Sequence, residues 1–177
     1  FSVASNGVLY RTDEVGCIPG ILDLWFAKRV EYKDEMIKQG NAGNKEKYAF
    51  YHKRQLVQKI LLNSLYGVLG LPAFRFYDVD NATAVTTTGQ TVIKSTADMA
   101  NIKYNKELGT PDLDSNIYID TDSVFFSAVP LMDKRFPNWK DEEQNTIAGY
   151  VNDIAEEMQD YLNDFYDILS KKIFNVD

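Results

Sequence analysis

The sequence predicts an α+β fold in which long helices outnumber a few short strands. Three observations carry this prediction: two helical patterns on either side of a glycine-containing break, a C-terminal pattern of apolar residues at helical spacing, and two short apolar runs around a tight turn. Hydrophobic residues make up 45% of the 177 residues, which is enough to build the core of one domain or of a large piece of a bigger one.

A helical hairpin is predicted over residues 19–69. Pro19 suits the first turn of a helix, and that helix should end at the break formed by residues 40–43, which contain two glycines and an asparagine. The second helix should run from about Lys45 to Leu69, where glycine and proline follow. Because the link is so short, we expect the two helices to pack antiparallel.

Outside this hairpin we expect two more long helices and several short elements. They are predicted as a two-residue turn at 6–7 between strands, an extended connection over 74–77, a helix over 81–105 with an irregular threonine-rich start, strands over 116–118 and 124–128, a loop over 130–140, and a helix over 142–174.

Charge is distributed unevenly along the chain. The net charge is −7, but residues 26–59 hold nine Lys or Arg against four acids, a net +5 that leaves −12 for the rest. A basic segment in an acidic body suits a module with one face that meets phosphates. Cys17 and His52 are the only residues of their types, which excludes an internal disulfide and Cys- or His-rich zinc centres, and both are interpreted as structural. No membrane span or secretory signal is found, so a cytoplasmic location is expected.

Asp120 and Asp122 lie at a sharp turn between the two predicted strands. Two residues apart on a strand, they should point to the same side, where carboxylate oxygens could bind a hard divalent cation. An ordinary acidic turn in water is the alternative for such a pair taken alone. A calcium loop beginning at Asp112 is rejected, because Ile117 stands where the turn glycine belongs and Ser123 where the bidentate glutamate belongs.

A row of functional side chains is predicted on the second helix. Lys59, Asn63, Tyr66 and Gly70 share one helical face. Lys59 can hold a phosphate, Asn63 can donate to a phosphate or sugar, and Tyr66 offers a flat surface to a base pair. Gly67 lets a base approach the backbone closely.

Two further cations stand on the first predicted helix. Arg29 and Lys33 are four residues apart and so share a face. If they lie opposite Lys59 and Asn63 across the helical hairpin, four donors should converge on one phosphate-sized volume. Basic pairs on a helix are usually solvated, so this expectation depends on the pairing of the two helices.

These segments resemble motifs of the family B DNA polymerases. Residues 118–123 read Tyr-Ile-Asp-Thr-Asp-Ser and resemble motif C, with Ile119 at its variable position, and residues 59–67 match motif B from Lys59 to Gly67. Phe26, Arg29 and Lys33 resemble the fingers helix that grips the triphosphate, and residues 86–90 resemble the palm segment after motif B.

The resemblance implies a role for each residue. Asp122 would be the catalytic metal ligand and Asp120 a supporting acid at the metals, two Mg²⁺ ions in the complete site. The nucleotide-binding set would be Arg29, Lys33, Lys59, Asn63, Tyr66 and Gly67, with Lys59 also assisting catalysis. Residues 19–69 would form the fingers, and residues 1–18 and 70–177 would form parts of the palm. The expected partners are primer–template DNA, a deoxynucleoside triphosphate and the rest of the polymerase.

Motif A, which reads Asp-x-x-Ser-Leu-Tyr-Pro-Ser in this family, is not found, nor are an exonuclease or a thumb. We therefore expect a fragment that is inactive alone, because motif A supplies the second metal-binding aspartate. Two alternatives stay open: a non-catalytic nucleotide- or DNA-binding module, and another polymerase class such as an RNA-dependent enzyme, in which paired aspartates commonly end the hairpin.

Overall fold

The computed structural model describes residues 1–176 and is α+β, as predicted. Its elements are β1 (Ser2–Val3), β2 (Leu9–Tyr10), α1 (Cys17–Asn41), α2 (Lys45–Leu69), α3 (Val79–Leu108), β3 (Asn116–Asp120), β4 (Ser123–Phe126), α4 (Val129–Arg135), the 3₁₀ turn η1 (Trp139–Asp141), α5 (Gln144–Leu169) and the π-helical turn η2 (Ser170–Phe174). The chain divides into a unit of residues 10–83 and a unit that contains residues 2–9 and everything from Ala84 onward.

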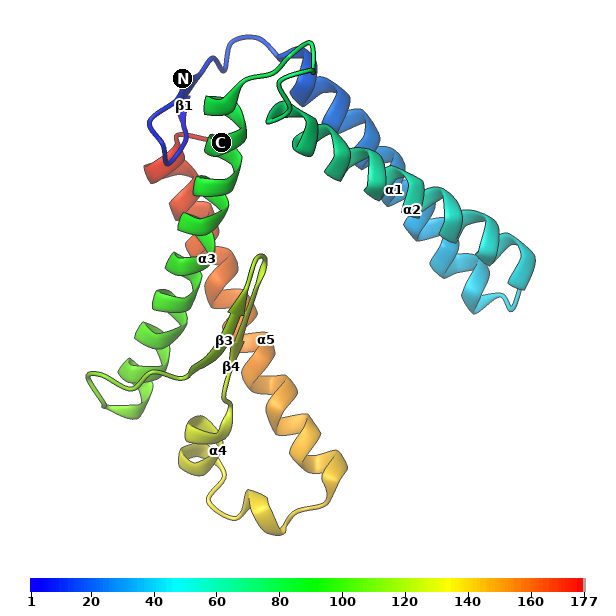
Figure 1. Ribbon diagram of the computed structural model, residues 1–177. Helices are drawn as coiled ribbons and strands as arrows, with labels where there is room; N and C mark the ends of the chain where they lie inside the picture. The colour runs from blue at the N-terminus through cyan, green and yellow to red at the C-terminus, as the bar shows by residue number, and fades with distance from the viewer. Residues whose placement is uncertain (177) are drawn as a thin grey trace. The chain divides into compact units, whose positions relative to one another are not determined.

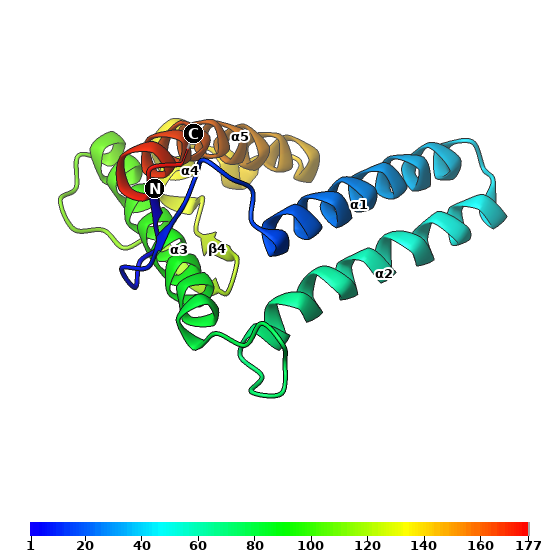
Figure 2. The same cartoon turned by 90° about the horizontal axis from the view of Figure 1, so that it is seen from above.

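The first unit is built on the antiparallel pair of α1 and α2, which Figures 1 and 2 show side by side. Gly43 allows the tight link because it adopts a φ of +70°, which favours glycine. The side chain of Asn44 then caps α2 by accepting a hydrogen bond of 3.1 Å from the backbone N–H of Lys47. The predicted helical hairpin is confirmed, and the predicted bounds of α2 are those observed.

The seam between α1 and α2 is only half-buried. Side chains at alternating spacings of three and four residues line it, as in a coiled coil. They are Leu22, Trp25, Arg29, Tyr32 and Met36 on α1, and Tyr51, Gln55, Gln58, Leu62 and Leu65 on α2. Among the described residues of this unit only Leu69, at the base of α2, is buried.

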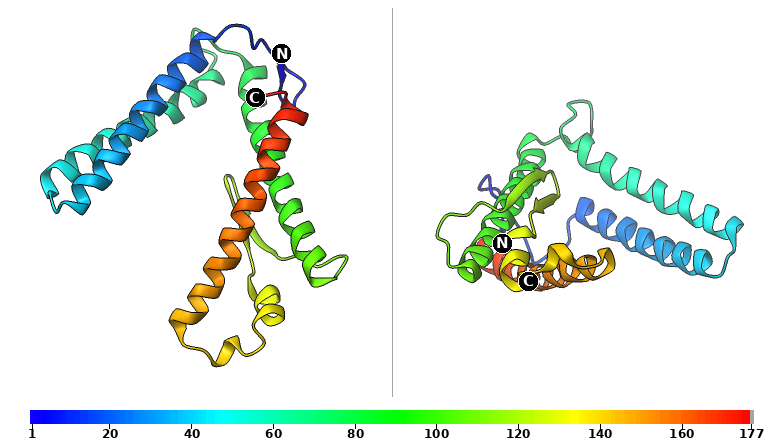
Figure 3. Two further views of the ribbon diagram at one scale, coloured as in Figure 1. Left: turned by 180° about the vertical axis from the view of Figure 1, so that it is seen from behind. Right: turned by 90° about the horizontal axis from the view of Figure 1, so that it is seen from below.

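The second unit has a compact apolar core. Helices α3 and α5 lie against each other in both views of Figure 3, and α4 closes the core. Its most deeply buried side chains are Tyr104, Leu131, Met132, Ile154 and Met158, each at most 2% exposed. The hydroxyls of Thr96 on α3 and Tyr166 on α5 lie 2.9 Å apart in a hydrogen bond that also joins the two helices.

Strands β3 and β4 form an antiparallel hairpin attached to this core. Tyr118 pairs with Phe125, and Asp120 with Ser123, with an irregularity between Asn116 and Tyr118. Near the base of the hairpin, the ring of Phe126 meets the buried ring of Tyr104 edge-on at 5.6 Å between centroids. This contact anchors the hairpin on the core while its tip stays exposed.

Four local predictions were wrong. The connection between β1 and β2 runs over residues 4–8, so it is longer than two residues; the N–H of Ala4 donates to the Val8 carbonyl, and the N–H of Gly7 to the Ala4 carbonyl. Residues 71–77 form hydrogen-bonded turns and not an extended segment. The threonine-rich start of α3 is regular helix, in which the hydroxyl of Thr91 donates to a carbonyl of the preceding turn and so does not disrupt the backbone hydrogen bonds.

The fourth wrong prediction is the loop over 130–140, which contains α4 and η1. Pro130 is compatible with α4 because it stands in the first turn, where its missing N–H leaves no bond unmade. Within the described residues, none of the helices combines the length and the apolar character that crossing a bilayer requires.

Candidate functional site

The candidate metal ligands occupy the tip of the β3–β4 hairpin. Asp120 is the last residue of β3, whereas Asp122 lies in the turn together with Thr121. The alternation of a strand therefore does not extend to Asp122, and the prediction that both carboxylates leave one side of a strand does not apply to it. The hydroxyl of Thr121 donates to the Asp120 carboxylate at 3.1 Å.

Both carboxylates are exposed to solvent. They are not buried between the apolar strands, because Asp120 ends β3 and Asp122 lies in the turn that follows. Exposed oxygen ligands two residues apart fit a hard divalent cation such as Mg²⁺, although they would fill only part of its coordination sphere. Among residues 1–176, no group of three or more His, Cys, Asp or Glu side chains is placed to hold a metal ion.

The predicted row on α2 is exposed along its length. Lys59, Asn63, Tyr66 and Gly67 all lie on the surface of the first unit, outside the half-buried seam. No ion pair engages Lys59 among the described residues. A Cβ added at Gly67 would meet no atom within 4 Å, so nothing in this unit fills the space above that glycine. The row is free to meet a ligand.

Lys33 belongs to the same side of the hairpin as Lys59. Gly40 of α1 and Tyr48 of α2 lie next to each other on one side of the hairpin, because a Cβ added at Gly40 would lie 3.2 Å from the Tyr48 ring. Lys33 stands two helical turns before Gly40, and Lys59 three turns after Tyr48, so helical geometry keeps both on that side. The two cations are separated by roughly 8 Å along the hairpin, so they form a row and not a single cluster.

Arg29 differs from the other three predicted donors, which are Lys33, Lys59 and Asn63. It is half-buried in the α1–α2 seam, and its Nε is buried without a hydrogen-bond partner within the described residues. The four predicted donors are therefore not equivalent, because three lie exposed on one side and the fourth emerges from between the helices. The signal was present in the sequence, since Arg29 continues the spacing of Leu22, Trp25, Tyr32 and Met36.

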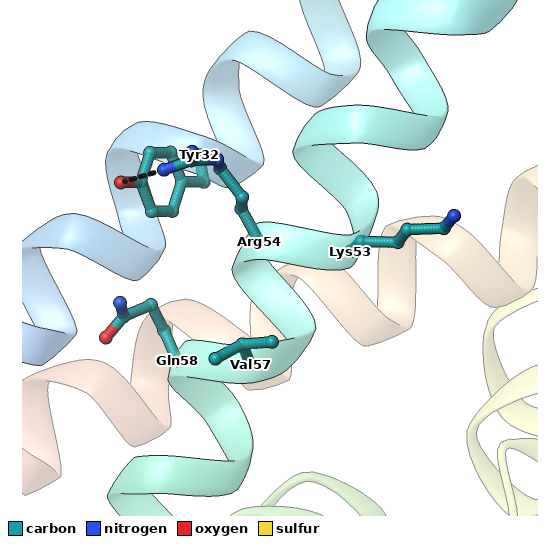
Figure 4. A pocket seen from close by; sticks show the side chains of 5 residues that line it. All are labelled: Tyr32, Lys53, Arg54, Val57 and Gln58. Atoms are coloured by element: carbon teal, nitrogen blue, oxygen red, sulfur yellow. Dashed lines mark hydrogen bonds between the residues drawn. The ribbon is translucent and has the colours of Figure 1, made fainter.

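A shallow hollow of about 340 Å³ lies on this unit, but not over the Lys59 row. It is lined by Tyr32, Lys53, Arg54, Val57 and Gln58, which Figure 4 shows in close-up. Arg54 donates to the Tyr32 hydroxyl at 3.4 Å, and its guanidinium lies 4.6 Å from the centroid of the Phe50 ring. Helical geometry places Arg54 and Val57 on the opposite side of the seam from Lys59 and Asn63.

His52 and Cys17 were both interpreted as structural, and neither stands in a chemical cluster. The His52 ring stacks on that of Tyr48 with 6.0 Å between centroids. Cys17 is a free, exposed cysteine at the start of α1. These observations agree with a local role for both residues.

Comparison with known proteins supports the resemblance of these motifs to those of the family B DNA polymerases. The model of DNA polymerase family B matches residues 2–160. The DNA-directed DNA polymerase of Escherichia phage RB69 is 37% identical over 182 residues, covering 76% of this chain and 20% of that protein. The DNA-directed DNA polymerase of Enterobacteria phage T4 is 40% identical over 114 residues, covering 62% of the chain and 12% of that protein.

A third relative covers a larger share of this chain. DNA polymerase 2 of Aeropyrum pernix is 31% identical over 143 residues, which cover 81% of this chain and 16% of that protein. The chain thus spans a fifth or less of the length of these three curated relatives.

Proposed function

Because this chain belongs to family B of the DNA polymerases, we propose that it supplies the fingers and part of the palm of a template-directed DNA polymerase. Residues 19–69 are the fingers, and residues 1–18 and 70–177 are parts of the palm. The single observation that carries the proposal is the exposed row from Lys59 to Gly67, which has the residue types of motif B and, within the described residues, no ion-pair partner for its cation. Relatives from two bacteriophages support action in a bacterial or infected-cell cytoplasm.

The fingers bind the incoming deoxynucleoside triphosphate. Lys33 and Lys59 neutralise phosphates along their row, and Arg29 adds a planar fork of donors from the seam. Asn63 donates to a phosphate or the sugar one turn beyond Lys59. Spacing of the cations by roughly 8 Å suits a chain of phosphates better than a single one. By neutralising the triphosphate, Lys59 also stabilises the charge that develops on the leaving group.

The nascent base pair lies against the end of this row. Tyr66 presents an exposed ring, and the empty space above Gly67 admits the base close to the backbone of α2. A side chain at position 67 would occupy that space. The palm residues then hold the primer terminus of the primer–template DNA.

The palm carries the metal ligands. Asp122, with Asp120 beside it, would hold Mg²⁺ together with the motif A aspartate of a segment outside these residues. When bound, two such ions lower the charge on the attacking and leaving oxygens. The primer 3′-hydroxyl displaces pyrophosphate from the α-phosphate, and Lys59 and Arg29 meet the charge on the departing group. Alone, the chain lacks one of these carboxylates and is inactive. A non-catalytic binding module is the alternative that this incomplete ligand set leaves open.

Primer extension by the complete polymerase tests the proposal. Asp122→Asn keeps the shape of the side chain and removes its charge, so nucleotide addition should fall at least about a thousandfold, or about 4 kcal/mol of barrier. Asp112→Asn is the matched control, because Asp112 is an equally exposed aspartate away from the tip, and it should be unaffected. Activity of Asp122→Asn within about tenfold of the parent would refute the metal-ligand role.

A further inference from the structure

The seam of the fingers contains two buried polar atoms that have no partner among residues 1–176. One is Nε of Arg29 on α1, and the other is Oε1 of Gln58 on α2. The first is a hydrogen-bond donor only, and the second is an acceptor only. In a seam otherwise lined by residues such as Trp25 and Leu62, a buried atom without a partner costs about 1–3 kcal/mol.

The register of the two helices places these residues opposite each other. The ring centroids of Tyr32 and Tyr51 lie 6.4 Å apart, and Arg54 donates to the Tyr32 hydroxyl. Tyr32 therefore faces residues 51–54 of α2. Because the helices are antiparallel, one turn toward the start of α1 corresponds to one turn toward the end of α2. This step leads from Tyr32 to Arg29 and from Arg54 to Gln58.

The side chain of Gln58 projects toward this step of the seam. Figure 4 shows its amide extending from α2 on the same side as Tyr32 of α1. Its Oε1 is fully buried although the residue as a whole is only half-buried. The two unpartnered atoms therefore belong to one layer of the seam and have complementary hydrogen-bonding roles.

We propose that Gln58 is a positioning residue for nucleotide binding: a change of side-chain rotamer brings its Oε1, which is unpaired in this structure, to Nε of Arg29, and the hydrogen bond so formed directs the guanidinium toward the incoming triphosphate. This inference rests on the proposed function of Arg29. With Nε held from within the seam, the terminal nitrogens of the guanidinium are left to reach the side that carries Lys33 and Lys59.

The chemistry favours a positioning role over a purely structural one. At a seam position a leucine would bury apolar surface and leave no acceptor to satisfy, so glutamine is a poor choice for stability alone. An arginine held at one nitrogen loses fewer rotamers when it binds phosphate, which lowers the entropy that binding must overcome. The prediction is a defect in nucleotide use without a defect in folding.

The test uses the complete polymerase and steady-state kinetics against the nucleotide. Gln58→Leu should raise KM for the nucleotide about tenfold, with a much smaller change in kcat, because about 1.4 kcal/mol of ground-state and transition-state binding is lost together. Gln58→Glu retains an acceptor oxygen at this place and should restore KM to within about threefold of the parent. Gln55→Leu, which changes another half-buried seam glutamine, is the matched control and should leave KM unchanged.

A double-mutant cycle separates this inference from the proposed function. If Gln58 acts through Arg29, Gln58→Leu should have no further effect in an Arg29→Ala background. Independent effects, an unchanged KM in Gln58→Leu, or an equal rise in Gln55→Leu would overturn the inference. If Arg29→Ala itself leaves KM unchanged, the assignment of Arg29 to the triphosphate fails instead.

Discussion

The two units of this chain are stabilised by different means. The unit built on α3 and α5 buries a cluster of large side chains, among them Tyr104 and Ile154, to 2% exposure or less. The α1–α2 hairpin has only a half-buried seam that includes Arg29 and two glutamines. Under the proposed function, a scaffold for metal ligands would gain from rigidity, whereas a hairpin that engages and releases a nucleotide would gain from weak, repackable contacts.

The same contrast appears in how the two units use their cations. Arg135 of the core unit makes paired hydrogen bonds to Glu107 at 2.6 and 2.8 Å and to Glu157 at 2.7 and 3.0 Å, joining α3, α4 and α5. Lys59 and Lys33 of the hairpin have no ion-pair partner in the described part of the chain. The first kind of cation stabilises the fold, and the second is left for a ligand.

The largest effect expected on stability is a cavity in the core unit. Met158→Ala should lower the free energy of unfolding by about 2–5 kcal/mol, because the Met158 side chain is only 2% exposed and its removal leaves a cavity in the core. Leu62→Ala in the half-buried seam should lower it by only about 1 kcal/mol. Urea denaturation of the 177-residue chain checks both, with Trp139 fluorescence reporting the core unit and Trp25 fluorescence the hairpin. Equal losses would show that the seam is as tightly packed as the core.

Sequence alone predicted the hairpin best, because its helices obey local rules. The glycine at 43 and the cap at Asn44 fix the break between α1 and α2 whatever else the chain does. The loop predicted over 130–140 is partly helical instead, because Pro130 stands in the first turn of α4, where a helix tolerates proline.

For the candidate site, the sequence predicts local features but not those that depend on packing. Residue type and spacing predicted roles for Lys59, Asn63 and Asp122 that stay predictions, and the structure shows that all three are exposed, as their positions on a helix face and a turn require. Arg29 was predicted as an exposed ligand, although it continues the spacing of Leu22 and Trp25 and so belongs to the seam. Its unpartnered Nε could not be predicted, since this depends on the three-dimensional packing of the two helices.

A smaller loss of stability is expected when the Arg135 network is broken. Hydrogen bonds from Arg135 lower the pKa of both Glu107 and Glu157. Because these pKa values are lower in the folded state, the stabilisation is present above the ordinary glutamate value of 4.5 and is lost as the pH falls below it. Arg135→Met should cost about 1–2 kcal/mol at pH 7, where both carboxylates lose their partner.

Urea midpoints at pH 7 and at pH 3 measure this effect, and the difference between parent and Arg135→Met should shrink at the lower pH. Lys140→Met is the control, because Lys140 and Asp133 form an exposed pair 3.3 Å apart that should contribute little. A difference that does not change with pH would mean that Arg135 stabilises through packing of its stem and not through its charge.

For an unpaired cation of the hairpin, the effect should fall on nucleotide use and not on stability. Lys59→Ala in the complete polymerase should lower kcat/KM for the nucleotide about tenfold, or about 1.4 kcal/mol, and leave the urea midpoint of the chain unchanged. DNA affinity across a salt series is the control measurement. A salt slope reduced by about one unit, with unchanged nucleotide kinetics, would assign Lys59 to the DNA backbone.

The smallest effect, and one of opposite sign, is expected at the centre of the core. The hydroxyl of Tyr104 is buried with no hydrogen-bond partner in the described part of the chain, and burial raises its pKa to about 12. Tyr104→Phe removes an unsatisfied polar atom and keeps the ring that contacts Phe126, so stability at pH 7 should rise by up to about 1 kcal/mol. Tyr166→Phe, which loses the hydrogen bond to Thr96, should instead destabilise by about 1 kcal/mol.

Because the pKa of Tyr104 is higher in the folded state, its neutral form contributes stability that is present below pH 10 and lost as the pH rises toward 12. Urea midpoints between pH 9 and pH 12 should therefore fall less steeply for Tyr104→Phe than for the parent, and a loss at pH 7 equal to that of Tyr166→Phe would mean that the Tyr104 hydroxyl has a partner in solution.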